Sequence, residues 1–282
     1  MTDATSLTDL LTLSAGEDNE TWIGAPETYG AVGIYGGHFL GQALSAAFET
    51  VTPDKLANSL HAYFLKAGNP ALPLAYRVKH LRDGRGYELR SVACSQQGED
   101  VFHMTASFKT DEDGDEHQKT MPTVPDVEHV VAERESRGEE RFRFPMTVGG
   151  RVEMELISDH FVPPEFKPGR EPRLQCWMRV PNAESSSQRM RQCMLAFLAD
   201  GTLMFNSALP YGVPFRTHRL TSLDQSVWFH RTPDVSQWML YDQRSTAAAD
   251  ARGLNEGEAF DQTGRIIMST AQESMLRRVP SQ

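Results

Sequence analysis

Three polar side chains in the C-terminal half of the sequence are of the types that can together activate a water molecule. Asp200 follows the apolar stretch MLAFLA at the end of a predicted helix, Ser222 starts a predicted strand, and Gln272 lies inside a strand near the C-terminus. A carboxylate can deprotonate water, while a hydroxyl and an amide can fix its position. Each residue also has an ordinary explanation, because Asp and Ser suit turns and Gln suits a solvent-facing strand position. The residue types alone leave both interpretations open.

Other catalytic chemistries lack their sequence signatures. The sequence contains no GxSxG motif, so it does not predict the nucleophile elbow of an α/β-hydrolase. HExxH and CxxC are also absent, and the nine histidines are scattered without metal-ligand spacing. The glycine-rich run at 33–38 lacks the strand–GxGxxG–helix order of a dinucleotide site. We therefore expect neither a metal nor a bound cofactor.

Composition and charge narrow the class of protein. The 282 residues carry a formal net charge of −10, which argues against a nucleic-acid partner. No apolar run is long enough for a membrane-spanning helix, and the N-terminus does not resemble a secretory signal. Three widely spaced cysteines predict free thiols in a reducing compartment, and we expect a cytoplasmic protein.

The sequence divides into three regions, which are residues 1–110, a polar connector at 111–149, and residues 150–282. In the first region, apolar residues recur at helical spacing after Gly36 and Gly37, and Thr52-Pro53 ends the predicted helix. β-rich runs follow at 59–68 and 73–110, with Asp83-Gly84 and Gln97-Gly98 suited to hairpin turns. A helix followed by an antiparallel meander is an α+β pattern.

The last region repeats this plan. A helix is predicted at 187–199, and strands are predicted at 151–157, 173–180, 221–231, 238–248, 252–262 and 265–276. Two strings also match between the halves. Ser59-Leu60-His61 resembles Ser222-Leu223-Asp224, and Met104-Thr105-Ala106-Ser107 resembles Ser269-Thr270-Ala271-Gln272, at offsets of 163 and 165 residues. The near-constant offset predicts a duplicated unit, although short β-rich strings can also match by coincidence.

Four segments together resemble the acyl-CoA thioesterase II family, the TesB-like double hot-dog thioesterases. They are GIYGGHFLGQALSAA, then LHAYFLKAGNP with VKHLRDGRGYELRSV, then DQSVWFHR, and finally STAAADARG continuing to STAQESML. The resemblance covers most of residues 20–110 and 172–278 and leaves out the connector. It implies an α+β double hot-dog fold, with two antiparallel sheets each wrapped around a long central helix.

The family resemblance also assigns roles to the three polar residues. In this family an aspartate, a hydroxyl residue and a glutamine hold and polarise the attacking water. They correspond here to Asp200 in CMLAFLAD, Ser222 ahead of DQSVWFHR, and Gln272 in STAQE. The family usually has Thr where this sequence has Ser222, so the hydroxyl is kept but the methyl that restrains χ1 is lost.

The implied substrate is a fatty acyl-CoA thioester, and the implied reaction is hydrolysis to free acid and coenzyme A. The CoA phosphates need cations, and Arg82, Arg85 and Arg90 around the DGRG turn are candidates, although charged hairpin tips often only keep a protein soluble. We expect a homo-oligomer, because hot-dog sheets have edges and flat faces that pair. The alternatives are a non-catalytic acyl-CoA-binding protein and an enoyl-CoA hydratase, whose Asp/His pattern we do not find.

Overall fold

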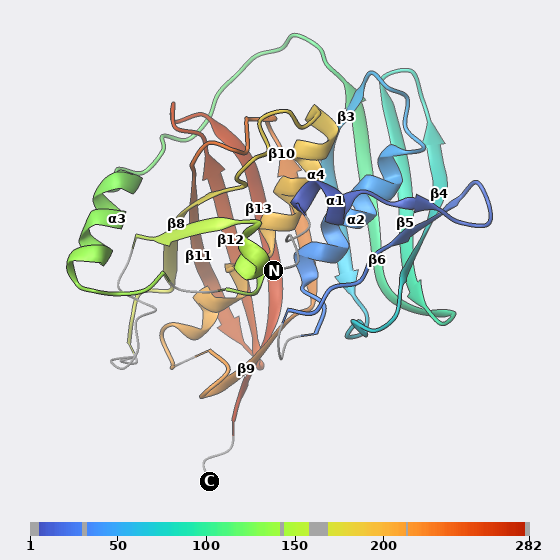
Figure 1. The fold of residues 1–282 in the computed structure, drawn as a ribbon. Helices are drawn as coiled ribbons and strands as arrows, with labels where there is room; N and C mark the ends of the chain where they lie inside the picture. Colours follow the sequence, from blue (N-terminus) through green and yellow to red (C-terminus); the bar gives the residue numbers. More distant parts are fainter. Residues whose placement is uncertain (1–5, 30–32, 142–143, 158–168, 213, 280–282) are drawn as a thin grey trace.

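One continuous antiparallel sheet forms the framework of the molecule (Figure 1). The computed structural model describes residues 6–29, 33–141, 144–157, 169–212 and 214–279. The N-terminal half contributes β1 (Ser14–Ala15), β2 (Thr21–Gly24), β3 (Lys55–Phe64), β4 (Leu74–Asp83), β5 (Tyr87–Gln96) and β6 (Glu99–Thr110). The C-terminal half contributes β7 (Glu153–Leu156), β8 (Arg173–Arg179), β9 (His218–Ser222), β10 (Asp224–Phe229), β11 (Met239–Ala249), β12 (Arg252–Phe260) and β13 (Ile266–Arg278).

The two halves of the sheet have the same strand order, counted outward from the centre. It is β3-β6-β5-β4-β2-β1 on one side and β10-β13-β12-β11-β8-β7 on the other, as a duplicated unit requires. The two halves meet where β3 pairs with β10, with His61 opposite Ser226. The family resemblance implied two antiparallel sheets, and this pairing joins them into one because it satisfies the backbone groups of two edges.

One of the two string matches is out of register. Met104 of β6 faces the core, whereas Ser269, which the string match places opposite it, lies on the outer face of β13. Successive strand residues face opposite sides, so a shift of one residue exchanges the faces. The repeat is therefore real in topology, although this string match does not give its residue correspondence.

Two helices, both predicted from the sequence, lie side by side against the sheet. They are α2 (Gly36–Phe48) and α4 (Gln188–Ala199). α2 packs on β2, β4, β5 and β6, while α4 packs on β3, β10 and α2. Almost every side chain of α2 is buried, and its small residues let α4 approach closely. The two helices run antiparallel, so the start of each helix lies beside the end of the other.

Shorter helices complete the fold. They are α1 (Leu7–Leu11), α3 (Val127–Ser136), and the 3₁₀ segments η2 (Pro145–Gly150) and η4 (Leu203–Ala208). α3 lies within the predicted connector and buries Val127 and Val130 against Trp177, Leu240 and Phe260 of the C-terminal half. Among the described residues, no helix has the length and apolarity needed to cross a membrane.

Candidate active site

A buried carboxylate lies where the end of α4 meets the start of α2. Asp200 is the C-cap residue of α4, and its side chain is carried inward because the preceding stretch, Met194 to Ala199, is buried in the core. Asp200 is itself only 5% exposed. The backbone N–H of Gly37, in the first turn of α2, donates to Asp200 Oδ2 at 3.1 Å. The carboxylate therefore faces the positive end of the α2 dipole.

The structure brings Ser222 and Gln272 to this carboxylate. Ser222 Oγ donates to Asp200 Oδ1 at 2.9 Å, and Gln272 Nε2 donates to the same oxygen at 2.5 Å. Gln272 lies in β13 and is fully buried, so the solvent-facing interpretation of this residue is wrong. Ser222 ends β9 and does not start the next strand, because the predicted strand is interrupted at Leu223. Residues far apart in sequence thus share one hydrogen-bonded cluster.

Two glycines make room for this cluster. A Cβ atom on Gly36 would lie 2.5 Å from Asp200 Oδ2, and one on Gly37 would lie 2.1 Å from the carbonyl oxygen of Phe197. Any larger residue would push the two helices apart. The sequence predicted Gly36 and Gly37 only as the start of a helix. Tyr35, the N-cap residue, provides no capping side chain, and this is a signal that the N–H groups of the first turn are left for another partner.

Burial raises the pKa of Asp200 to about 6, and hydrogen bonds from Ser222, Gln272 and the Gly37 N–H oppose that rise. At neutral pH the group is therefore ionised, yet it is a stronger base than an ordinary aspartate. A carboxylate has about four acceptor positions. The three donors occupy two positions on Oδ1 and one on Oδ2. The remaining position on Oδ2 can accept a hydrogen bond, and then a proton, from water.

The three arginines of the DGRG turn lie elsewhere. Arg90 is buried, and its guanidinium pairs with Asp83 at 2.7 Å and Glu88 at 2.9 Å and also donates to Thr50. In the structure it is an internal ion-pair partner, and a contact with the CoA phosphates stays a prediction. Its position was readable from the alternation of β5, whose inward-facing residues include Val92 and Cys94.

Arg82 and Arg85 are exposed on the hairpin that joins β4 and β5. This hairpin lies near Thr50, just beyond the end of α2, whereas Asp200 lies at the start of that helix. A helix of 13 residues is about 20 Å long. The structure therefore does not bring these arginines to the polar cluster.

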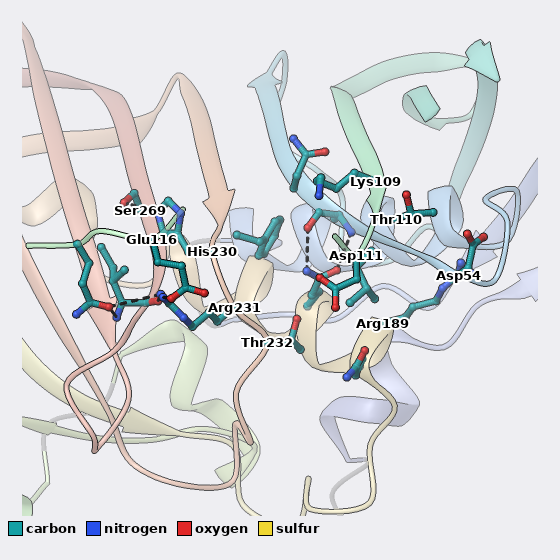
Figure 2. A pocket seen from close by; sticks show the side chains of 18 of the residues that line it. Asp54, Lys109, Thr110, Asp111, Glu116, Arg189, His230, Arg231, Thr232 and Ser269 are labelled. Carbon is teal, nitrogen blue, oxygen red and sulfur yellow. Dashed lines mark hydrogen bonds and ion pairs between the residues drawn. The ribbon is translucent and has the colours of Figure 1, made fainter. Parts of the chain in front are cut away.

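At the opposite end of the α2–α4 pair, where α2 ends and α4 begins, an arginine side chain occupies the space between the helices. Arg189, in the first turn of α4, donates to the carbonyl oxygens of Phe48 at 2.9 Å and Lys55 at 3.1 Å, and its guanidinium lies 4.9 Å from the Phe48 ring centroid. A groove of about 1250 Å³ lies beside it (Figure 2). Acidic and basic side chains mix around this groove, and two of its lining residues, Arg231 and Glu116, form an ion pair. That mixture does not favour a phosphate-rich ligand.

Among the described residues, no group of three His, Cys, Asp or Glu side chains is placed to bind a metal ion. The three cysteines are buried free thiols. Burial raises the pKa of Cys94 to about 12 and that of Cys176 to about 12, so both are poor nucleophiles at neutral pH.

Comparisons with known proteins agree over both halves. The family model described as the acyl-CoA thioesterase N-terminal domain matches residues 25–109, and that described as the C-terminal domain matches residues 125–276. Human acyl-coenzyme A thioesterase 8 is 33% identical over 88% of this chain and 81% of its own length. Acyl-CoA thioesterase 2 of Haemophilus influenzae is 30% identical over 92% of this chain and 93% of its own.

Solved structures give the same picture. The acyl-CoA thioesterase II TesB2 of Mycobacterium marinum superimposes with a TM-score of 0.79 at 29% identity, over 96% of this chain and 98% of that one. A hot-dog protein from Alicyclobacillus acidocaldarius superimposes with a TM-score of 0.77 at 21% identity, over 98% of this chain and 100% of that one.

Proposed function

Because this chain belongs to the acyl-CoA thioesterase II family and hydrolyses acyl-CoA thioesters, we propose that Asp200 activates the attacking water. The family predicted from the sequence motifs is confirmed. The observation that carries the proposal is the buried Asp200 carboxylate, which accepts from three fixed donors and keeps one acceptor position on Oδ2. A pKa of about 6 is close to the value that suits a general base at neutral pH.

The proposed reaction needs no covalent intermediate. Asp200 Oδ2 takes a proton from water as the water oxygen bonds to the thioester carbonyl carbon. The tetrahedral intermediate then collapses, the C–S bond breaks, and the sulfur leaves with its electron pair. A thiol has a pKa near 8.5, so its thiolate leaves with little acid assistance. The protonated Asp200 then returns its proton to the thiolate or to solvent.

Charge on the carbonyl oxygen needs donors, and the start of α2 offers them. The Gly37 N–H in its first turn is directed toward the cluster, where it donates to Asp200, and N–H groups at a helix start suit a developing negative charge. The absence of a side chain at Gly36 would let the thioester approach this backbone closely. We therefore propose that the oxyanion binds at the beginning of α2.

Ser222 and Gln272 are proposed to orient the base and the water. Both donate to Asp200 Oδ1, which turns Oδ2 toward the substrate. The nearby contact of 3.1 Å between Gln272 Nε2 and Ser222 Oγ links them into one unit. Their contribution is to preorganise the site, because neither removes the proton.

The fold is a hot-dog fold built on a large antiparallel sheet. We propose in addition that each half is one hot-dog unit wrapped around its own helix, with residues 1–110 and 150–282 as the units and 111–149 as the connector. The mirrored strand order supports this division.

The remaining proposals concern partners and location. Tyr63, Leu65 and Trp228 expose large apolar side chains at the seam between the halves, which supports a homo-oligomer. Buried free cysteines are compatible with a cytoplasmic location. Arg82 and Arg85 are exposed cations available to the CoA phosphates, but only to a part of the ligand far from the thioester. We propose no nucleic-acid partner, given the net charge of −10.

Intact-protein mass spectrometry tests the proposed mechanism. The protein is quenched with acid during steady-state turnover of an acyl-CoA, and its mass is compared with that of protein kept without substrate. Direct attack by water predicts an unchanged mass under both conditions. An added mass equal to the acyl group would show a covalent acyl-enzyme and would contradict the mechanism.

A further inference from the structure

We propose that Gln225 is a positioning residue that sets the orientation of the Gln272 amide. This inference rests on the proposed role of Gln272 at the water site. Gln225 is the second residue of β10, and its side chain is fully buried. Its Oε1 accepts a hydrogen bond from Gln272 Nε2 at 2.7 Å. The strand that carries it is fixed on both sides, because β10 pairs with β3 and with β13.

The hydrogens of the Gln272 amide are fully committed. An amide nitrogen carries two hydrogens. The two shortest contacts of Gln272 Nε2 lead to Asp200 Oδ1 at 2.5 Å and to Gln225 Oε1 at 2.7 Å. Ser222 Oγ lies further away, at 3.1 Å, and uses its own hydrogen toward Asp200. One N–H of Gln272 therefore serves the base, and the other serves Gln225.

The carbonyl side of the same amide is left for a ligand. Gln272 Oε1 is buried and has no hydrogen-bond partner among the described residues. A buried acceptor without a partner costs free energy, so a donor is expected there in the working site. The attacking water can supply that donor. It would give one hydrogen to Asp200 Oδ2 and the other to Gln272 Oε1, which leaves a lone pair for the thioester carbon.

Gln225 prevents the amide from turning over. If the amide rotated by half a turn, Gln272 Oε1 would face the Asp200 carboxylate and the Gln225 carbonyl oxygen, which are both acceptors. Gln225 therefore acts through Gln272 and without contact to the reacting atoms. Gln225 Nε2 is itself directed toward the carbonyl oxygen of Ser226, at 3.3 Å, which keeps the Gln225 acceptor pointing at Gln272.

Steady-state kinetics of Gln225→Met, Gln272→Met and the double variant test this role. Met keeps the volume and removes the acceptor. Loss of one neutral hydrogen bond predicts a fall in kcat of about five- to tenfold in Gln225→Met, with KM almost unchanged. The double variant is expected to be no slower than Gln272→Met, because Gln225 has nothing left to orient.

A buried glutamine outside the cluster supplies the matched control. Gln192 binds the backbone N–H and carbonyl of Ala57 at 2.8 and 2.9 Å near the other end of the helix pair. Gln192→Met is expected to lower stability and to leave kcat within about twofold of wild type, since two hydrogen bonds remote from the site are lost. A fall in kcat as large as that of Gln225→Met would show that both effects are merely structural.

If Gln225→Met does not fold, Gln225→Asn replaces it, because the shorter side chain withdraws the acceptor while remaining polar. Wild-type kcat in either folded variant would overturn the proposal. Losses that multiply in the double variant would also overturn it. Asp200→Asn distinguishes failure of the proposed base from failure of the positioning role. A normal kcat in Asp200→Asn would refute the proposed base. An inactive Asp200→Asn variant together with a normal kcat in Gln225→Met would refute only the positioning role.

Discussion

The antiparallel helices α2 and α4 meet at two ends, which are related by the repeat but contain different residues. At one end, Gly37 in the first turn of α2 donates to Asp200 after the last turn of α4. At the other end, Arg189 in the first turn of α4 donates to the carbonyl oxygens of Phe48, which ends α2, and of Lys55. Glu49 stands exposed there, in the place that corresponds to Asp200. The fold supplies two equivalent places, and the residues at the helix start decide which of them can hold a base.

Glycine and arginine act in opposite ways at these two ends. Gly36 and Gly37 leave space, and the Gly37 N–H is directed into it, so a carboxylate can enter and be held. Arg189 fills the equivalent space with its own side chain and donates hydrogen bonds to the carbonyl oxygens of Phe48 and Lys55. One end is therefore suited to chemistry and the other to holding the halves together.

The largest difference is expected between Asp200→Asn and Glu49→Gln, the same change at the two helix ends. Asp200→Asn removes the basic oxygen and is expected to lower kcat by about 10²–10⁴-fold. Glu49→Gln changes an exposed group and is expected to leave kcat within about twofold. Thiol release from an acyl-CoA measures both. Equal effects of the two substitutions would mean that the ends do not differ in chemistry.

Ser222 tests the same end with a smaller effect. Ser222→Ala removes one donor to Asp200 Oδ1 and is expected to lower kcat by about tenfold, the scale of a hydrogen bond to a charged group. Ser222→Thr keeps the hydroxyl, restores the usual family residue and is expected to retain wild-type kcat. A Thr variant as slow as the Ala variant would show that the hydroxyl is not what matters.

Arg189→Met tests the other end, where activity is expected to change least. The substitution leaves the carbonyls of Phe48 and Lys55 without their donor, and should lower the free energy of unfolding by about 1–3 kcal/mol. The kcat of the folded variant is expected to stay within about twofold of wild type. Urea denaturation and thiol release measure the two quantities, and a loss of kcat without a loss of stability would contradict this division of roles.

The sequence predicted the elements and the three polar residues better than it predicted the contacts between the halves. Helical spacing located α2 and α4, and family motifs identified Asp200, Ser222 and Gln272. The bond from Gly37 to Asp200 spans 163 residues, and local patterns carry no information about such distances. The pairing of β3 with β10 was missed for the same reason, which is why one sheet was predicted as two.

Arg90 and Gln225 show two other limits. Arg90 was grouped with its exposed neighbours because the hairpin tip is charged, although the alternation of β5 turns it inward to Glu88. Gln225 stands in the segment DQSVWFHR, where neither its residue type nor its spacing marks it for a role. Its role becomes visible when β10 is placed beside β13, where its side chain meets Gln272.

The pH dependence of kcat/KM tests most directly whether Asp200 is the base. Burial raises the pKa of Asp200 to about 6, so the active ionised form is lost as the pH falls through that value. Wild-type kcat/KM is predicted to be level above pH 7 and to drop about tenfold per pH unit well below 6. The residual activity of Asp200→Asn should lack this drop. A level profile in the wild type, or the same drop in Asp200→Asn, would contradict the account.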